Sequence, residues 1–499
     1  MPGANEGKKR APPVSDWDFA SIAELTKALR SRKLSASELL EQTIARIEVL
    51  DQRVNAIVVR DFDRARAAAK LADAAFARGE QRPLLGIPVT LKEPYNVAGL
   101  QTTWGLPQFK NFVPSEDALA VSRLKQAGAI IIGKTNIPMG LREFQSFNDI
   151  YGTTNNPWDL GRSPGGSSGG SAAALAAGFG PLSLGSDIGG SIRVPAHFCG
   201  VFGHKPSLGL IPLRGYSLPP APPVPGQGDL AVVGPMARYA SDLALSLDVI
   251  AGPDEAREGI GYQLALPAPR HADLRNFRVL VVDTHPLMPT SDAVRTAIAD
   301  LAQRLVRLGT KVTYDSASLP NLADSARLYM RLLDAARSPR VSADAFVEAQ
   351  RHSAALSADD RSLDAERARG SVMSHRDWLA ADAARLQLQQ QWRIFFGKFD
   401  VVLYPSAAVP AFPQDQSEPI EARQTDIDGK AYPYLDAFFI WADPATTCGL
   451  PATAAPIGKS ASGLPIGLQI IGPYLEDRTT IAFAELVERE FGGFVPPVL

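Results

Sequence analysis

Two loops rich in glycine and serine constrain this chain more than any other feature. Residues 163–171 read Ser-Pro-Gly-Gly-Ser-Ser-Gly-Gly-Ser, and residues 185–193 read Gly-Ser-Asp-Ile-Gly-Gly-Ser-Ile-Arg. A flexible linker would lack apolar runs, but here residues 198–203 continue as Phe-Cys-Gly-Val-Phe-Gly. Glycines permit a positive φ and close backbone approach, so consecutive N–H groups can point at one spot. We therefore interpret the second loop as a nucleophile, Ser191, beside an oxyanion hole.

The order of elements later in the chain predicts an α/β fold. Residues 278–282 (Arg-Val-Leu-Val-Val) predict a strand, and residues 311–315 predict another. Between them, the apolar side chains of residues 294–308 recur at alternating spacings of four and three, as on one face of a helix closed by Gly309. A strand, a helix and a strand in this order pair in parallel.

Other elements follow from caps and composition. Ser21 and Ser35 each precede a glutamate by three residues, which predicts two capped helices. The short apolar run 85–92 contains a proline and predicts a strand near a sheet edge that ends at Lys92. Further segments predict helices at 63–78, across most of 320–397 and at 477–491, and strands at 129–132, 401–404 and 463–471.

Charge and cysteine content exclude several classes of function. With 51 basic and 53 acidic residues the net charge is −2, so nothing favours nucleic acid or an anionic membrane as a partner. Two cysteines exclude a disulfide framework and a cysteine-rich zinc site. The six histidines show no ligand-like spacing, so neither a metal nor another cofactor is expected. A small neutral molecule is the expected partner.

The first residues carry no sorting signal that we recognise. Lys8, Lys9 and Arg10 are not followed by an apolar stretch, so a signal peptide is not predicted, and residues 1–20 are expected to be flexible. No run of 18 apolar residues occurs. The expected location is therefore the cytoplasm, without membrane association.

Two familiar patterns are rejected on local grounds. Residues 128–135 match the phosphate-binding pattern G-x-x-x-x-G-K-[ST], but the intervening Ala-Ile-Ile-Ile favours a strand rather than a loop. Residues 165–169 match the nucleophile elbow G-x-S-x-G, but no apolar strand leads into them and no credible histidine base is present.

Taken together, several motifs resemble the amidase signature family. The resemblance is nearly continuous over residues of about 20 to 255 and resumes near the C-terminus. It implies a large mixed, mostly parallel β-sheet covered by helices on both faces, and a Ser-cisSer-Lys triad that hydrolyses linear or cyclic amide bonds. Matching by motif makes Ser191 the nucleophile, Ser167 the bridging serine and Lys92 the base. The motifs are residues 86–93, 133–138, 154–157, 165–171, 186–193, 198–206, 447–451 and 464–469.

The chemistry of this assignment agrees with the residues themselves. A serine hydroxyl needs a neighbour that takes its proton, and a lysine can do so only when burial keeps it neutral. Lys92 ends an apolar run, and Ser167 can relay the proton from Ser191. The backbone N–H groups of residues 188–191 are the expected oxyanion hole. The sets are Ile188, Gly189, Gly190 and Ser191 for the hole, Ser168, Asp187 and Arg193 as supporting residues, and Leu141 and Phe144 for the substrate pocket.

The resemblance also implies the domain organisation but leaves the substrate open. Residues 21–499 are expected to form one amidase domain, with a core of about 70–255 and 440–499 and a variable helical pocket segment of about 286–440. The protein is expected to be a monomer or homodimer acting on a small-molecule amide. Alternatives are the glutaminase-type subunit of a tRNA-dependent amidotransferase, or a carbamate, cyclic oligoamide or aryl acylamide hydrolase. The amidotransferase role is less favoured, because Arg193-Val-Pro stands where that group has Arg-Gln-Pro.

Overall fold

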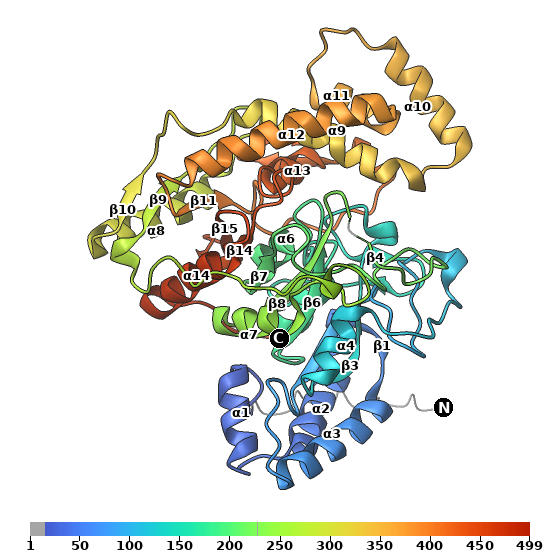
Figure 1. Cartoon of the computed structure of the whole chain (residues 1–499), viewed down its shortest axis with the longest axis vertical. Coiled ribbons are helices and arrows are strands. Elements are labelled where there is room, and N and C mark those ends of the chain that lie inside the picture. Colours follow the sequence, from blue (N-terminus) through green and yellow to red (C-terminus); the bar gives the residue numbers. More distant parts are fainter. Residues whose placement is uncertain (1–14, 227) are drawn as a thin grey trace, which may run out of the picture.

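The computed structural model describes residues 15–226 and 228–499, and its centre is one mixed sheet (Figure 1). The expectation for residues 1–14 lies outside the described residues. In spatial order the strands are β1 (Ile57–Arg60), β3 (Ile130–Thr135), β2 (Pro88–Lys92), β6 (Leu182–Asp187), β8 (Val232–Ala237), β7 (Phe202–Lys205), β14 (Ala452–Lys459), β15 (Pro465–Ile471), β11 (Val401–Pro405), β9 (Arg278–Val281) and β10 (Lys311–Thr313). Two small hairpins add β4 (Phe147–Asn148) with β5 (Gly152–Thr153), and β12 (Gln424–Ile427) with β13 (Lys430–Pro433).

Helices surround this sheet. In Figure 1, α1–α3 lie at one end of the molecule and α9–α12 at the opposite end. The α-helices of the described residues are α1 (Ile22–Arg30), α2 (Ala36–Val54), α3 (Phe62–Ala77), α4 (Leu119–Gln126), α5 (Gly169–Ala176), α6 (Arg193–Cys199), α7 (Ala240–Ile250), α8 (Asp292–Leu308), α9 (Leu322–Arg337), α10 (Ala343–Ala355), α11 (Leu363–Ser371), α12 (His375–Phe395), α13 (Asp436–Ala442) and α14 (Asp477–Phe491).

The α/β class and the mixed sheet are confirmed, but the expectation of mostly parallel pairing is wrong. Parallel pairs join β3, β2 and β6 on one side and β11, β9 and β10 on the other. The other six neighbouring pairs are antiparallel. The predicted order β9–α8–β10 is parallel as expected, whereas β14 and β15 are joined only by residues 460–464, which is too short for a parallel crossover.

Strand β2 does not lie at an edge of the sheet. It pairs with β3 on one side and β6 on the other. Pro88 is its first residue, where a missing N–H disrupts the ladder least, so the proline gave the wrong indication. The consequence for the site is that Lys92, at the end of β2, is completely buried.

Both faces of the sheet are covered, because successive side chains of β9 point to opposite faces and each face packs against a hydrophobic cluster. Val279 and Val281 pack into one hydrophobic cluster together with side chains of α8 and α14. Leu280 points the other way, into a second cluster formed with α9, α12 and α13. This second cluster continues to Phe144 and Phe439, so the helices on that face also build the surroundings of the candidate site.

Local signals at helix ends are confirmed. Ser21 and Ser35 both form the reciprocal capping box with the glutamate three residues later. Gly309 ends α8 in the left-handed conformation. Residues 130–135 of the rejected phosphate-binding pattern form the buried strand β3.

Candidate active site

Lys92 and Ser167 meet at the carboxyl end of β2. The distance from Lys92 Nζ to Ser167 Oγ is 2.7 Å. The same nitrogen lies 2.8 Å from Ser186 Oγ and 3.5 Å from the Ser186 carbonyl oxygen. Tyr216 donates its hydroxyl to Ser186 Oγ at 2.5 Å. An ammonium at Lys92 would thus have one acceptor for each N–H, whereas a neutral amine would leave its lone pair for the proton of Ser167.

The surroundings of Lys92 favour the neutral amine. The residue is inaccessible to solvent, and burial lowers the pKa of its amine well below the ordinary value, with Asp187 opposing this through its charge. Because Asp187 is itself paired with Arg193, its negative charge does little for Lys92. A lysine in this position can accept a proton near neutral pH.

A backbone hydrogen bond connects Ser191 to Ser168, the residue that follows Ser167. The N–H of Ser168, next to Ser167, donates to the carbonyl of Ser191 at 3.2 Å. Ser168 Oγ lies 3.3 Å from both the carbonyl oxygen and the amide nitrogen of Ser186. The peptide bond between Gly166 and Ser167 is cis. These contacts join the two glycine-rich loops through Ser168.

The loop around Ser191 is organised by Asp187 and Arg193. The Arg193 guanidinium donates two bonds to the Asp187 carboxylate, at 2.8 and 3.0 Å, with both side chains fully buried. Burial opposes ionisation of Asp187, but the charge and hydrogen bonds of Arg193 lower its pKa to about 2. Arg193 also reaches Thr446 and Gln469 at 2.9 and 2.8 Å. The pair therefore fixes the loop to the C-terminal part of the chain.

One of the four expected oxyanion donors is already used. The N–H of Gly190 donates to Asp187 Oδ1 at 2.8 Å, so the prediction for this residue is corrected. Within the described part of the chain, the N–H groups of Ile188, Gly189 and Ser191 have no acceptor. The Gly190 N–H thus joins the Arg193 guanidinium on Asp187 Oδ1, and Ile188, Gly189 and Ser191, whose N–H groups have no acceptor among the described residues, all line the pocket at Ser191.

The two glycines of this loop are required for different reasons. A Cβ on Gly189 would lie 2.6 Å from the Phe439 ring, so only glycine allows that approach. Gly190 has a φ of 98°, which L-residues rarely adopt. Tyr329 donates its hydroxyl to the carbonyl of Ile188 at 2.9 Å. This bond holds the peptide group between Ile188 and Gly189, which also contains the Gly189 N–H.

Removal of Arg193 is expected to destabilise the fold strongly. Arg193→Ala leaves Asp187 buried without its charge partner, which costs about 3–5 kcal/mol in free energy of unfolding. Urea denaturation measures this loss. The control is Arg351→Ala, because both side chains of its pair with Glu348 are more than 70% exposed and such pairs contribute about 0–1 kcal/mol. Equal effects of the two substitutions would contradict a structural role for the Asp187–Arg193 pair.

A narrow pocket opens at Ser191. Leu141 and Phe144, the two pocket residues chosen from the sequence, both line it with Ile188 and Gly189. The sequence did not point to the remaining lining residues. They are Arg142 and Glu143 beside them, Leu333 and Arg337 from α9, and Phe439 from α13.

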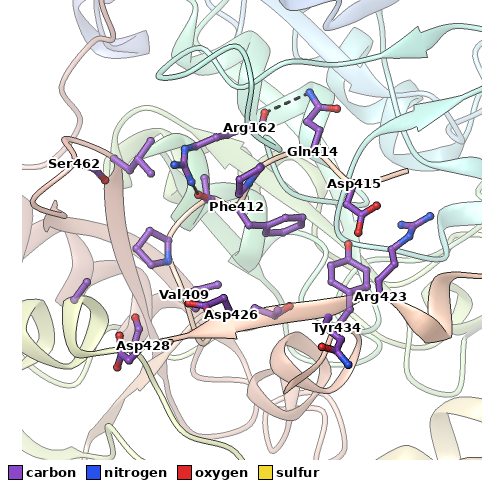
Figure 2. Close-up of a pocket in the computed structure, with 18 residues that line it drawn as sticks. Arg162, Val409, Phe412, Gln414, Asp415, Arg423, Asp426, Asp428, Tyr434 and Ser462 are labelled. Carbon is purple, nitrogen blue, oxygen red and sulfur yellow. Dashed lines mark hydrogen bonds between the residues drawn. The ribbon is translucent and has the colours of Figure 1, made fainter. Parts of the chain in front are cut away.

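A larger pocket lies elsewhere. It has a volume of about 540 Å³ and contains none of Lys92, Ser167 and Ser191. Figure 2 shows Tyr434 and Arg423 on its wall, and both also bond Glu143, at 3.2 and 2.7 Å. The two pockets are thus neighbours separated by this group of side chains and by Phe144, which packs against Tyr434.

Over residues 15–226 and 228–499, no three side chains of His, Cys, Asp or Glu are grouped as a metal site. None of the helices in these ranges is both long and apolar enough to cross a bilayer.

Sequence reasoning missed Ser186, Tyr216 and Tyr329. Ser186 stands inside one of the motifs given above, and only its contact with Lys92 reveals its position. Tyr216 follows 30 residues later, and Tyr329 is 141 residues from Ile188. No local pattern marks either tyrosine.

Comparisons with known proteins agree with this architecture. The sequence model of the family described as Amidase matches residues 38–481. A putative amidase of Mycobacterium tuberculosis, AmiB2, is 37% identical over 486 residues, covering 95% of this chain and 96% of the relative. One subunit of the glutamyl-tRNA(Gln) amidotransferase of Geobacillus stearothermophilus is 31% identical, covering 94% and 96%. A crystal structure of an amidase superposes with a TM-score of 0.75 at 29% identity, covering 95% of this chain and all of the other.

Proposed function

Because the chain belongs to the amidase signature family of hydrolases, we propose that it hydrolyses a small-molecule carboxylic amide through an acyl-enzyme on Ser191. The observation that carries this proposal is the contact of Ser167 Oγ with the buried amine of Lys92. A buried amine with a lowered pKa next to a hydroxyl is a base with a relay, and Ser191 lies on the adjoining loop.

In the first half of the reaction, Ser191 Oγ attacks the amide carbon. Its proton passes to Ser167 Oγ, while the proton of Ser167 moves to the lone pair of Lys92 Nζ. The oxygen of the tetrahedral intermediate accepts hydrogen bonds from Ile188, Gly189 and Ser191 N–H. The proton then returns through Ser167 to the leaving nitrogen, and the C–N bond breaks.

In the second half, water enters in place of the amine. It gives its proton to the same relay and attacks the ester carbon of the acyl-enzyme. The carboxylic acid leaves and Ser191 regains its proton, so Lys92 ends neutral. No step needs a metal or an organic cofactor.

A glutaminase-type role is the second candidate, favoured by the similarity to the amidotransferase protein of Geobacillus stearothermophilus. Against it stands Arg193-Val-Pro195, since this group has Arg-Gln-Pro there. Glutaminase activity that rises when partner subunits are added would support it. Carbamates, cyclic oligoamides and aryl acylamides are further substrate classes compatible with the same chemistry.

A turnover screen with a covalent trap tests the proposal. Primary amides, anilides, carbamates and matching esters are compared, and a sulfonyl fluoride is used to label the enzyme. We expect turnover of at least one amide class and labelling of one residue, Ser191. Stoichiometric labelling at another residue would exclude the assigned nucleophile.

Ser186→Ala is expected to move the acid limb of kcat/KM to lower pH. Ser186 Oγ accepts from Lys92, and bonds from a charged donor are stronger than those from a neutral one. Its loss therefore disfavours the ammonium and lowers the pKa of Lys92 further. Tyr216→Phe is the comparison, since it removes a competing donor from the same oxygen and shifts the limb upward. Shifts in the same direction would contradict this network.

A further inference from the structure

The charges around the Ser191 pocket are unbalanced. Three charged residues line it: Arg142, Glu143 and Arg337. The Glu143 carboxylate is already neutralised by Arg423 at 2.7 Å and accepts further bonds from Gln145 and Tyr434 at 2.9 and 3.2 Å. Its charge is therefore not available to either arginine of the pocket.

The two arginines lack equivalent partners. Among the described residues, Arg142 has no carboxylate within 4.0 Å, and its side chain is exposed. Arg337 approaches only Asp334, one turn back on α9, at 3.7 Å, which is too long for a hydrogen bond. Burial also raises the pKa of Asp334, which weakens it as a counter-charge. The pocket therefore presents two guanidinium groups with unused N–H donors.

Apolar side chains flank Arg337. Its guanidinium lies 5.8 Å from the centre of the Phe439 ring, the same ring that packs against Gly189 of the oxyanion loop. Leu333 lies one turn before Arg337 and also lines the pocket. An arginine beside aromatic and aliphatic side chains, in the same pocket as Ser191, is suited to bind a planar anion through two parallel bonds.

The neighbouring large pocket does not share this feature. There Arg162 pairs with Asp159 at 3.1 Å, and Arg423 pairs with Glu143. Asp426 and Asp428 add negative charge to its wall. Of these two neighbouring pockets, the one that holds Ser191 is the one whose arginines lack a carboxylate at hydrogen-bond distance.

We propose that Arg142 and Arg337 form an anion subsite, so that the preferred substrate is an amide whose acyl portion carries a carboxylate. This inference rests on the proposed function, because it places the anion relative to an acyl group on Ser191. The substrate class is the monoamide of a short dicarboxylic acid. Leu141, Phe144 and Leu333 contact the methylene groups between the two ends, while the arginines take the free carboxylate.

A matched pair of covalent reagents tests the subsite without knowledge of the natural substrate. Alkyl fluorophosphonates of equal chain length, one ending in a methyl group and one in a carboxylate, are compared by their second-order rates of labelling at Ser191. A short series of chain lengths is used. We expect the best carboxylate reagent to label about tenfold faster than its methyl partner, with the preference falling as salt rises.

Variants separate the subsite from general effects of charge. Arg337→Gln and Arg142→Gln are expected to remove most of the preference, measured as the ratio of the two reagents' rates within the same variant, so that a general change in the reactivity of Ser191 cancels. The exposed Arg142 side chain has no ion pair to lose among the described residues, so its replacement keeps the test valid even if Arg337→Gln folds poorly. Arg327→Gln is the control, because Arg327 lies on the same helix but bonds the Arg361 carbonyl at 2.9 Å, outside the pocket.

The outcomes distinguish the two proposals. Faster labelling by the carboxylate reagent that depends on Arg142 and Arg337 supports the subsite. Equal rates for the two reagents at Ser191 overturn the subsite and leave the proposed function standing. A preference that survives both arginine variants also overturns it. Absence of labelling at Ser191 by both reagents overturns the proposed function and the subsite together.

Discussion

Ser191→Ala is expected to abolish amide hydrolysis. Loss of a serine nucleophile removes the acyl-enzyme route altogether, and a fall in kcat of about 10⁶-fold is the scale for such a change. Ser167→Ala is expected to be less severe, leaving a slow residual activity, because the nucleophile and the three backbone donors remain. Steady-state rates and trapping of the acyl-enzyme by rapid quench measure both variants.

The matched control for these variants is Ser171→Ala. Ser171 belongs to the same glycine-rich loop as Ser167, but its Oγ lies 2.7 Å from Thr135 Oγ1, whereas Lys92 bonds Ser167 and Ser186. Its replacement is expected to keep activity within about tenfold. An acyl-enzyme in Ser191→Ala, or a loss in Ser171→Ala as large as in Ser191→Ala, would mean that the nucleophile is misassigned.

Lys92→Met is expected to reduce kcat/KM for amides by about 10²- to 10⁴-fold, the range of general acid–base catalysis. Methionine keeps the length of the side chain in its fully buried position but cannot carry a proton. Matching activated esters are expected to lose less, because their leaving groups depart without protonation. Lys92→Arg should resemble Lys92→Met, since arginine stays protonated and cannot act as a base. Equal losses for amides and esters would contradict a role in protonating the leaving group.

Local patterns predicted much of the fold because they depend on neighbours in sequence. The capping boxes at Ser21 and Ser35 follow from side chains three residues apart. The sequence analysis did not identify β6, β8 and β14, and it placed β2 near an edge. Which strands become neighbours depends on contacts between distant segments, and β2 is enclosed by β3 and by β6, which begins at Leu182.

The candidate site was predictable to the extent that it lies in the family motifs. The structure brings Lys92 and Ser167 into contact, joins Ser191 to them through Ser168, and pairs Asp187 with Arg193. The use of the Gly190 N–H by Asp187 was not predictable, because it depends on where a carboxylate points rather than on which residues are present.

The residues that shape the pocket were least predictable. Arg337 and Phe439 come from α9 and α13, helices whose sequences show amphipathic or apolar character and no catalytic pattern. They reach Ser191 only because these helices cover one face of the sheet. Substrate preference is for this reason a property of the folded chain rather than of its motifs.

The pH dependence of Ser191 labelling tests the central claim most directly, namely that neutral Lys92 activates Ser191. A fluorophosphonate is used, the labelled residue is identified by mass spectrometry, and the rate is followed from acid to mildly alkaline pH. Burial lowers the pKa of Lys92, and only the deprotonated amine accepts a proton. In the wild type the rate should therefore climb through this pKa and then stay high, and Lys92→Met should lose the climb. An unchanged pH profile in Lys92→Met, with Ser191 still labelled, would show that another group is the base.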